Sequence, residues 1–370
     1  MRDDELMDRA IGLGEQGRRS APPNPWVGSV VASEGRIVGE GFHARRGEPH
    51  AEAIALQAAG DRARGSTVYA TLEPCSHHGR TPPCADALIE AGVARVVVAV
   101  EDSDPHVHGA GIARLRDAGI DVQVGTGADA AGRSLAPYLH HRRTGGAWCL
   151  VKTAMSLDGF TAAADGTSKW ITGEEARADA HELRADSQAI VVGSGTALAD
   201  RPALTVRGVE SPPSTPPLRV LLDARGRVPA EGPLFDVELA PTLVVTTEHA
   251  PVNVTDAWHA AGAKVETLPS GFDGHGVELQ HVLWLLGRLG VLQAMFEGGS
   301  TVHAALLDGL FVDHVTAYVA PTFLAGGLAA FGPRGRDSMA PHAARYQFVE
   351  ARRVGSDLRI DLEQRRGDAA

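Results

Sequence analysis

The sequence predicts an α/β protein built from two domains. Its 370 residues are enough for two domains of ordinary size, each with its own hydrophobic core. Predicted helices and strands alternate along the whole chain, as expected for sheets that are covered by helices. The alternation pauses at Thr144-Gly145-Gly146 and then resumes. We therefore predict one domain over residues 1–146 and a second over residues 147–370.

The first domain is predicted from apolar runs, prolines and turn residues. Pro49 and Pro83 each stand at the start of a helical segment, where the fixed backbone angle of proline is favourable. The predicted elements are, in order, a helix over 3–18, strands over 27–32 and 36–41, a helix over 50–59, a strand over 67–71, a helix over 83–91, a strand over 95–100, a helix over 109–118 and a strand over 121–124. This order is typical of a three-layer α/β/α domain.

The second domain shows the same alternation with longer connections. A proline-rich stretch over 211–217 is predicted to be a loop within the domain, because apolar strands continue on both sides of it. The predicted elements are a strand over 148–154, a helix over 174–184, strands over 189–192, 218–222 and 242–246, a helix over 277–289, a strand over 292–296, a helix over 301–310 and two closing strands.

The amino-acid composition argues against some classes of binding partner. Charged residues make up 22% and hydrophobic residues 44% of the chain, as in soluble globular proteins, and the net charge of −11 argues against broad binding to nucleic acid or anionic membranes. No apolar segment has the length of a signal peptide or a membrane span. The chain has three cysteines, too few for a disulfide framework. We expect a cytoplasmic protein with no nucleic-acid or membrane partner.

Four residues in the first domain predict a catalytic zinc site. His50, Cys75 and Cys84 supply one imidazole and two thiolates, enough for a zinc ion whose fourth position is open to water. Glu52 follows the histidine by two residues and can carry a proton for a zinc-bound water. An H-x-E motif followed by a P-C segment is the signature of zinc deaminases that act on bases.

The spacing of the two cysteines departs from the commonest deaminase pattern. That pattern is P-C-x-x-C, but here eight residues, 76–83, separate Cys75 from Cys84. The inserted residues place polar and cationic groups beside the expected metal. A closed structural zinc site, with His77 or His78 as the fourth ligand, remains an alternative.

Two glycine-containing turns in the second domain suggest phosphate binding. The sequence GSGT at 193–196 follows a strand, but the third glycine of a Rossmann fingerprint is replaced by Leu198. The sequence EGGST at 297–301 lies between a buried strand and a helix, where backbone N–H groups can hold a phosphate. A plain structural turn explains the second pattern equally well.

Longer motifs resemble a known family. The strings NPWVG at 24–28, GEPHAE at 47–52 and TLEPCSHHGRTPPC at 71–84 are similar to those of the bifunctional riboflavin-biosynthesis deaminase/reductases of the RibD type. The resemblance implies a cytidine-deaminase-like first domain, with zinc ligands His50, Cys75 and Cys84, and Glu52 as the proton carrier. It also implies substrate contacts at Asn24, His43, His77 and Arg80.

The resemblance continues through the second domain. The strings KTAMSLDG at 152–159, SKWIT at 168–172 and ADRPALTVR at 199–207 are similar to the family's reductase domain, which implies a dihydrofolate-reductase-like α/β fold and NADPH as cofactor. The implied NADPH contacts are Ala154, Trp170, Thr196, Asp200, Gly299, Ser300, Thr301, Val302, His303, Ala304 and Ala305. The implied substrate contacts are Ser168, Arg184, Leu204, Arg207 and Glu297. Arg201 stands where the family usually has a second aspartate.

We therefore expect a homo-oligomeric enzyme that acts on a small phosphorylated pyrimidine. It would deaminate a 2,5-diamino-6-ribosylamino-pyrimidinone 5′-phosphate and then reduce the ribosyl group to ribityl with NADPH. One alternative is a tRNA or nucleoside deaminase with an unrelated second domain, which the acidic composition and the cysteine spacing disfavour. A non-enzymatic, zinc-stabilised ligand-binding protein is the other.

Overall fold

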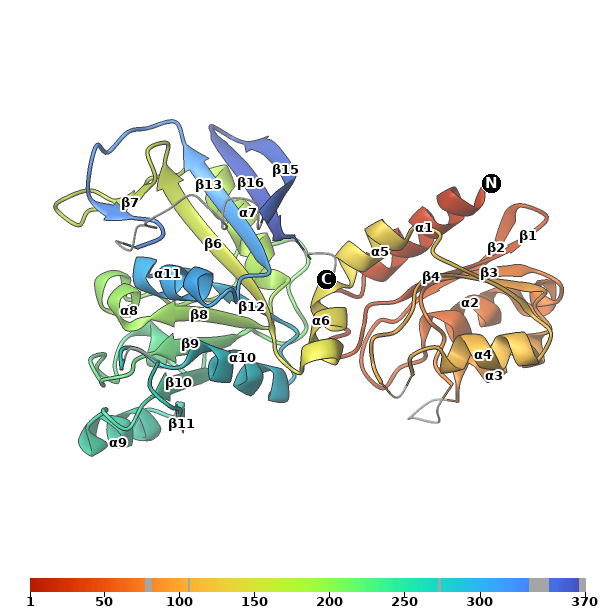
Figure 1. Cartoon of the computed structure of the whole chain (residues 1–370), viewed down its shortest axis with the longest axis horizontal. Helices are drawn as coiled ribbons and strands as arrows, with labels where there is room; N and C mark the ends of the chain where they lie inside the picture. Colours follow the sequence, from red (N-terminus) through yellow and green to blue (C-terminus); the bar gives the residue numbers. More distant parts are fainter. Residues whose placement is uncertain (77–81, 106, 272–273, 333–345, 366–370) are drawn as a thin grey trace. The chain divides into compact units, whose positions relative to one another are not determined.

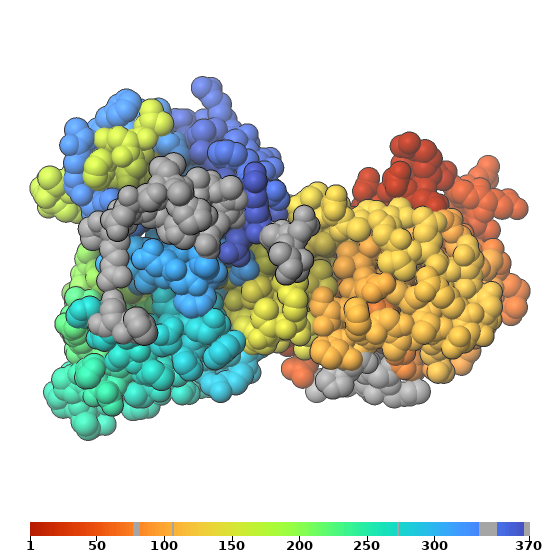
Figure 2. Space-filling view, viewed as in Figure 1, coloured from red at the N-terminus to blue at the C-terminus, as the bar shows by residue number. Residues whose placement is uncertain are grey.

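The chain forms two compact units in a computed structural model that describes residues 1–76, 82–105, 107–271, 274–332 and 346–365. The first unit comprises residues 1–146 and the second residues 147–370. In Figure 2 the red-to-yellow residues of the first unit and the green-to-blue residues of the second each gather into one body. No helix in the described part of the chain is long and apolar enough to cross a membrane.

A five-stranded sheet forms the centre of the first unit, in the order β2-β1-β3-β4-β5 (Figure 1). Strand β1 pairs antiparallel with β2 and β3, whereas β3, β4 and β5 run parallel. The elements are α1 (Asp3–Glu15), β1 (Gly28–Ser33), β2 (Arg36–Phe42), α2 (Ala51–Ala59), a 3₁₀ turn (Gly60–Ala63), β3 (Thr67–Leu72), α3 (Cys84–Ala91), β4 (Arg95–Val100), α4 (Ala110–Asp117), β5 (Asp121–Val124), α5 (Ala128–Ser134) and α6 (Ala136–Thr144).

Helices cover both faces of this sheet and give the unit three layers. Adjacent strand residues point to opposite faces, so Val30 packs with α1 and α5, while Val31 packs against the core that α2, α3 and α4 cover. Leu6 and Met7 fill the first core, and Leu88 fills the second.

Two glycines on β2 let α2 lie directly on the sheet. A Cβ at Gly39 would lie 2.2 Å from the carbonyl oxygen of Ala55, and one at Gly41 would lie 2.5 Å from that of Ala51. Any larger residue would push the helix away, because non-bonded atoms cannot approach that closely. These glycines therefore fix the start of α2, which carries His50 and Glu52.

A nine-stranded sheet forms the second unit, in the order β11-β10-β9-β8-β12-β6-β13-β16-β15. All neighbours from β11 to β13 are parallel, and the β13–β16 and β16–β15 pairs are antiparallel. The elements are β6 (Trp148–Ser156), β7 (Phe160–Ala162), α7 (Glu174–Ala185), β8 (Ala189–Gly193), α8 (Ser194–Asp200), β9 (Leu218–Leu222), a 3₁₀ turn (Pro233–Phe235), β10 (Thr242–Thr246), α9 (Val252–Ala260), β11 (Lys264–Thr267), α10 (Leu279–Arg288), β12 (Gln293–Phe296), α11 (Ser300–Asp308), β13 (His314–Ala320), β14 (Leu328–Ala329), β15 (Tyr346–Val354) and β16 (Asp357–Gln364).

Separate cores lie on the two faces of the larger sheet. On one face, Val191 and Phe296 pack against helices α10 and α11. On the other, Ile190 and Met295 belong to a core that includes Trp258 of α9. The parallel strands are buried on both faces, and so their sequences are nearly continuous apolar runs.

Several element predictions were incomplete. The first helix ends at Glu15, not at residue 18, because the N–H groups of Gln16, Gly17 and Arg18 bond to carbonyl oxygens three residues back, as in a turn. Short helices α5 and α6 follow β5, and the GSGT turn is the start of α8. Four described strands, not two, follow α11. Strand β15 is largely exposed, with Phe348 and Val349 among its exposed residues, so it lacks the alternation of buried apolar and exposed polar residues that marks a strand in sequence.

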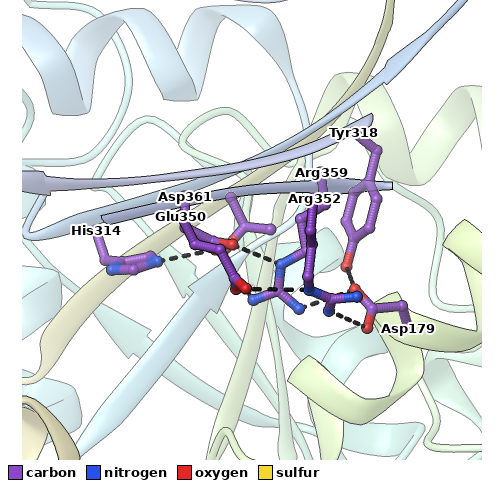
Figure 3. Close-up of polar contacts among 8 residues, drawn as sticks. Asp179, His314, Tyr318, Glu350, Arg352, Arg359 and Asp361 are labelled. Carbon is purple, nitrogen blue, oxygen red and sulfur yellow. Dashed lines mark hydrogen bonds and ion pairs between the residues drawn. The ribbon is translucent and has the colours of Figure 1, made fainter. Parts of the chain in front are cut away.

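A polar network holds α7 against the antiparallel end of this sheet (Figure 3). The carboxylate of Asp179 accepts hydrogen bonds from the Tyr318 hydroxyl at 2.6 Å and from Arg352 and Arg359 at 2.8 Å. Arg359 also donates to Asp361 at 2.7 Å. Burial opposes ionisation, but hydrogen bonds from a neighbouring histidine and from Arg359 hold the pKa of Asp361 below its ordinary value.

We predict that Asp361→Asn destabilises the second unit by about 3 kcal/mol, because it leaves Arg359 with one buried carboxylate partner fewer. Since the folded-state pKa of Asp361 is lowered, its ionised form stabilises the protein above about pH 4, and this contribution is lost as the pH falls further. The difference in unfolding temperature between the wild type and the variant should therefore be constant from pH 7 to about pH 5 and become smaller between about pH 4 and pH 3, without closing at pH 3. Asp256→Asn, on the exposed side of α9, is the control. A difference in unfolding temperature that does not change with pH would contradict the stabilising role of the ionised Asp361 carboxylate.

Candidate active sites

Three metal-ligand atoms come together in the first unit. The Nδ1 atom of His50 lies 3.1 Å from Sγ of Cys84 and 3.6 Å from Sγ of Cys75. A tetrahedral zinc ion with ordinary Zn–N and Zn–S distances separates such ligands by about 3.5 Å. Within the described ranges, this is the one group of three His, Cys, Asp or Glu side chains whose ligand atoms lie within 4.8 Å of one another. The predicted donor set therefore fits zinc.

Local sequence explains why these side chains converge. His50 is the N-cap of α2, Cys84 is the first residue of α3, and Cys75 follows the end of β3. The Cys84 N–H group donates to the Cys75 sulfur at 3.4 Å. Hydrogen bonds from Cys84 and His50 lower the pKa of the Cys75 thiol, and so favour the thiolate that a metal requires.

A buried glutamate fixes the segment that carries Cys75. Both oxygens of Glu73 accept backbone N–H groups, from Asp102 at 3.2 Å and Gly109 at 2.9 Å, and from Gly111 at 2.9 Å and Ile112 at 3.2 Å. The side chain is 4% exposed and lies at the start of α4. Its negative charge is stabilised there by the unpaired N–H groups of the helix.

Glu52 is a buried carboxyl beside the metal ligands. It is 3% exposed and lies in the first turn of α2. Burial raises its pKa above the ordinary glutamate value, because the charged form is poorly solvated, and the charge of His50 opposes the shift. A carboxyl group of raised pKa can accept and return a proton near neutral pH.

Two of the predicted substrate contacts of the first unit, Asn24 and His43, lie beside the metal ligand His50. The amide Nδ2 of Asn24 lies 3.0 Å from Nε2 of His43, and the His43 ring stands edge-on to that of His50 with centroids 5.3 Å apart. His43 also contacts the carbonyl oxygen of Pro49 through Nδ1 at 3.1 Å. The carbonyl must accept, so Nδ1 carries the proton and Nε2 accepts from Asn24. Burial lowers the pKa of His43, in keeping with this neutral form.

Part of the insertion between the two cysteines lies outside the described residues. His77 and Arg80, predicted to contact substrate, fall within residues 77–81. His78, the other alternative fourth zinc ligand, falls there as well. These three predictions are untested by the structure.

In the second unit, the predicted cofactor residues Thr196 and Gly299–Ala305 lie at the carboxyl ends of β8 and β12. Gly299 is the N-cap of α11, and both it and Gly298 have positive φ angles, of 91° and 142°. A Cβ at Gly298 would lie 3.3 Å from the hydroxyl oxygen of Thr196 in α8, so the two turns touch. The N–H groups at the start of α11 can hold a phosphate, and this arrangement fits the pyrophosphate of NADPH.

Two of the predicted substrate residues, Arg184 and Glu297, form an ion pair at the end of β12. Arg184 of α7 pairs with both carboxylate oxygens of Glu297 and donates to the carbonyl oxygen of Thr205 at 2.9 Å. Leu204 is 3% exposed and has a positive φ of 51°. The N–H group of Arg207 donates to Nδ1 of His181 at 3.2 Å. Arg184 thus anchors Glu297.

The remaining predicted residues are more scattered. Ala154 lies on β6, Ser168 is half-buried after β7, and Asp200 is the exposed last residue of α8. Trp170 is 69% exposed and stacks under the guanidinium of Arg177 at 4.5 Å. The ring of His303 is buried, with both nitrogens 3.3 Å from backbone carbonyl oxygens, so a cofactor contact there would involve its backbone alone.

One residue near the Arg184–Glu297 pair was not predicted. Lys152 stands in the apolar strand β6, and burial lowers its pKa while the nearby charge of Glu297 opposes that shift. A lysine within a strand that is otherwise apolar was the signal available in the sequence.

Comparison with known proteins identifies the family. Residues 1–100 match the model of the cytidine and deoxycytidylate deaminase zinc-binding region, and residues 147–360 match that of the RibD C-terminal domain. The riboflavin biosynthesis protein RibD of Chlamydia pneumoniae is 50% identical over 325 residues, which cover 86% of this chain and 84% of that protein. The chain belongs to the RibD family. The predicted resemblance is confirmed.

Solved RibD structures share the fold over almost the whole chain. RibD from Acinetobacter baumannii matches with a TM-score of 0.86 at 36% identity, covering 98% of this chain and 99% of that one. A diaminohydroxyphosphoribosylaminopyrimidine deaminase/5-amino-6-(5-phosphoribosylamino)uracil reductase from Thermotoga maritima matches with a TM-score of 0.84 at 31% identity, covering 98% of each. These matches confirm the predicted fold classes.

RibD membership also confirms the broad functional prediction. The chain is a bifunctional riboflavin-biosynthesis enzyme that combines a zinc-binding deaminase domain with an NADPH-dependent reductase domain and acts on a small molecule.

We predict that Glu73→Gln loosens the zinc site, although Glu73 is not a ligand. The amide has a single acceptor oxygen and no charge to hold four N–H donors, so the unfolding free energy should fall by about 1–3 kcal/mol. Zinc should also be lost faster to a chelator than from the wild type. Glu90→Gln, on the exposed side of α3, is the matched control. Equal zinc loss from the two variants would show that Glu73 does not position the site.

Proposed function

We propose that residues 1–146 deaminate a phosphoribosylaminopyrimidine and that residues 147–370 reduce the ribosyl group of the product with NADPH. The observation that carries the proposal is the convergence of His50, Cys75 and Cys84 beside the buried Glu52. The related protein of Thermotoga maritima carries both activities in its name. Its similarity extends over both units of this chain and favours the same pair of reactions here.

In the deaminase domain, His50, Cys75 and Cys84 would hold the zinc ion, which when bound makes water acidic enough to attack at neutral pH. Glu52 would accept the proton of that water and return it to the departing amino group, so that ammonia leaves. Burial raises the pKa of Glu52, so its carboxylate is a stronger base towards that water than an exposed glutamate would be.

Asn24 and His43 would position the pyrimidine. Their mutual hydrogen bond fixes the orientation of the Asn24 amide, whose remaining N–H and oxygen can pair with the edge of a base. The bond from His43 to Pro49 ties this pair to the residue before the ligand His50. His77 and Arg80 remain proposed substrate contacts from the family motif, with Arg80 suited to the phosphate.

In the reductase domain, NADPH would lie along the carboxyl ends of β6, β12 and β8. Gly299–Ala305 and Thr196 would hold its phosphates, with Ala154, Trp170 and Asp200 as further contacts. Ser168, Arg184, Leu204, Arg207 and Glu297 would hold the phosphorylated substrate. Hydride transfer would depend mainly on the orientation of the two bound molecules, with the Lys152 side chain nearby.

We further propose that the enzyme works in the cytoplasm as a homo-oligomer and binds no nucleic acid. The acidic composition and the low cysteine content support the first and last points.

We predict that Glu52→Gln lowers ammonia release at least 100-fold while the zinc content stays unchanged, because the variant loses the proton carrier and keeps all three ligands. NADPH oxidation with the deaminated pyrimidine supplied should match that of the wild type. Glu90→Gln should behave as the wild type in both assays. Undiminished ammonia release with zinc retained would overturn the deaminase mechanism and favour a ligand-binding role.

A further inference from the structure

Three side chains along one face of α7 hold the loops that carry predicted ligand contacts. Arg177, His181 and Arg184 are spaced by four and three residues, so they lie on the same face of the helix. Arg177 donates to the carbonyl oxygen of Thr172 at 2.8 Å, and Arg184 donates to that of Thr205 at 2.9 Å. This face of α7 therefore fixes the backbone of two loops, one before the helix and one after α8.

His181 makes the third contact and has no predicted role. The backbone N–H group of Arg207 donates to its Nδ1 atom at 3.2 Å. A ring nitrogen can accept such a bond only when it carries no proton, so the ring is neutral and its proton is on Nε2. Protonation would break the bond, because an imidazolium ring has donors on both nitrogens and no acceptor.

The surroundings of His181 favour this neutral form. The ring is half-buried, and burial lowers its pKa because the charged form loses solvation. The positive charges of Arg184, Arg207 and Lys152 lower the pKa further. The negative charge of Glu297, which follows β12, opposes them but does not outweigh them. At neutral pH His181 is therefore available as an acceptor for Arg207.

The contact matters because Arg207 lies outside the regular structure. It belongs to the connection over residues 201–217, where the structure describes every residue and none belongs to a helix or strand. Its side chain is exposed, and an exposed arginine loses conformational entropy when it binds a ligand. A backbone that is already fixed reduces that loss, since fewer conformations remain to be given up.

We propose that neutral His181 is a positioning residue of the reductase site, which holds the backbone of Arg207 so that its guanidinium group meets the phosphate of the pyrimidine substrate. The inference rests on the proposed reductase function, in which Arg207 contacts that substrate, and adds a residue to which the resemblance gives no role. A guanidinium group binds a phosphate through paired, charge-assisted hydrogen bonds, and these require a defined orientation. His181 would supply that orientation without touching the substrate.

The direct test is steady-state oxidation of NADPH by the full-length protein with the deaminated pyrimidine as substrate. His181→Ala should raise the KM for the pyrimidine about five- to tenfold, because the hydrogen bond to Arg207 is lost. The kcat and the KM for NADPH should change less than about twofold, since the lost interaction is the same in the ground state and the transition state. His181→Asn should restore a KM close to that of the wild type, because its side-chain oxygen Oδ1 can accept the same N–H group. His259→Ala, on the exposed side of α9, is the matched control.

The pH profile separates this role from a purely structural one. Between about pH 8 and pH 5, the ratio of the wild-type KM to that of His181→Asn should be constant above about pH 6.5 and rise below it, because only the wild type has an imidazole that loses its acceptor on protonation. Protonation of the substrate phosphate, with a second pKa of about 6, affects both proteins equally and cancels in the ratio.

Equal KM values for the pyrimidine in His181→Ala and His259→Ala would overturn the inference, as would a ratio that does not change with pH. Equal increases in the KM values for the pyrimidine and for NADPH, which a general loosening of the second unit would produce, would overturn it too. In each case a wild type that oxidises NADPH with the deaminated pyrimidine leaves the proposed function standing. A wild type that does not oxidise NADPH in this assay would overturn the proposed function itself.

Discussion

The geometry of the deaminase site depends on how the segment after β3 is held. Cys75 belongs to no helix or strand, and its position relative to Cys84 and His50 is set by a neighbouring carboxylate. Glu73, two residues earlier, is tied by four backbone N–H groups to the segment that leads into α4. The other two ligands need no such anchor, because each stands at the start of a helix that packs on the sheet. The buried carboxylate of Glu73 thus fixes the position of Cys75 relative to the sheet and to the other two ligands.

In the reductase domain, too, backbone N–H groups at the start of a helix are placed to hold negative charge. In both units the proposed chemistry lies where parallel strands end and helices begin, since unpaired N–H groups there attract negative charge. In the first unit the charge belongs to thiolates and a carboxylate. In the second it would belong to the phosphates of cofactor and substrate, which we propose to lie near the start of α11 and the Arg184–Glu297 pair. The Asp179 network steadies α7, which carries Arg184.

Sequence was sufficient where function depends on short motifs. His50, Glu52, Cys75 and Cys84 were recognisable because zinc requires particular donors and the motif sets their spacing, and the deep parallel strands were recognisable as apolar runs. Contacts between distant residues were not predicted. Glu73 meets donors 29 to 39 residues away, and Arg184 and Glu297, which the resemblance implied as substrate contacts, pair across 113 residues. Neither separation leaves a local pattern.

The most direct measurement follows ammonia and NADPH together after the diaminopyrimidinone ribosylamino phosphate is mixed with the zinc-loaded protein and excess NADPH. The account predicts that ammonia appears first, that NADPH absorbance falls after a lag, and that both reach one equivalent per substrate. The lag should disappear when the deaminated pyrimidine is supplied instead. NADPH oxidation without prior ammonia release, or ammonia release with no later oxidation of NADPH, would contradict it.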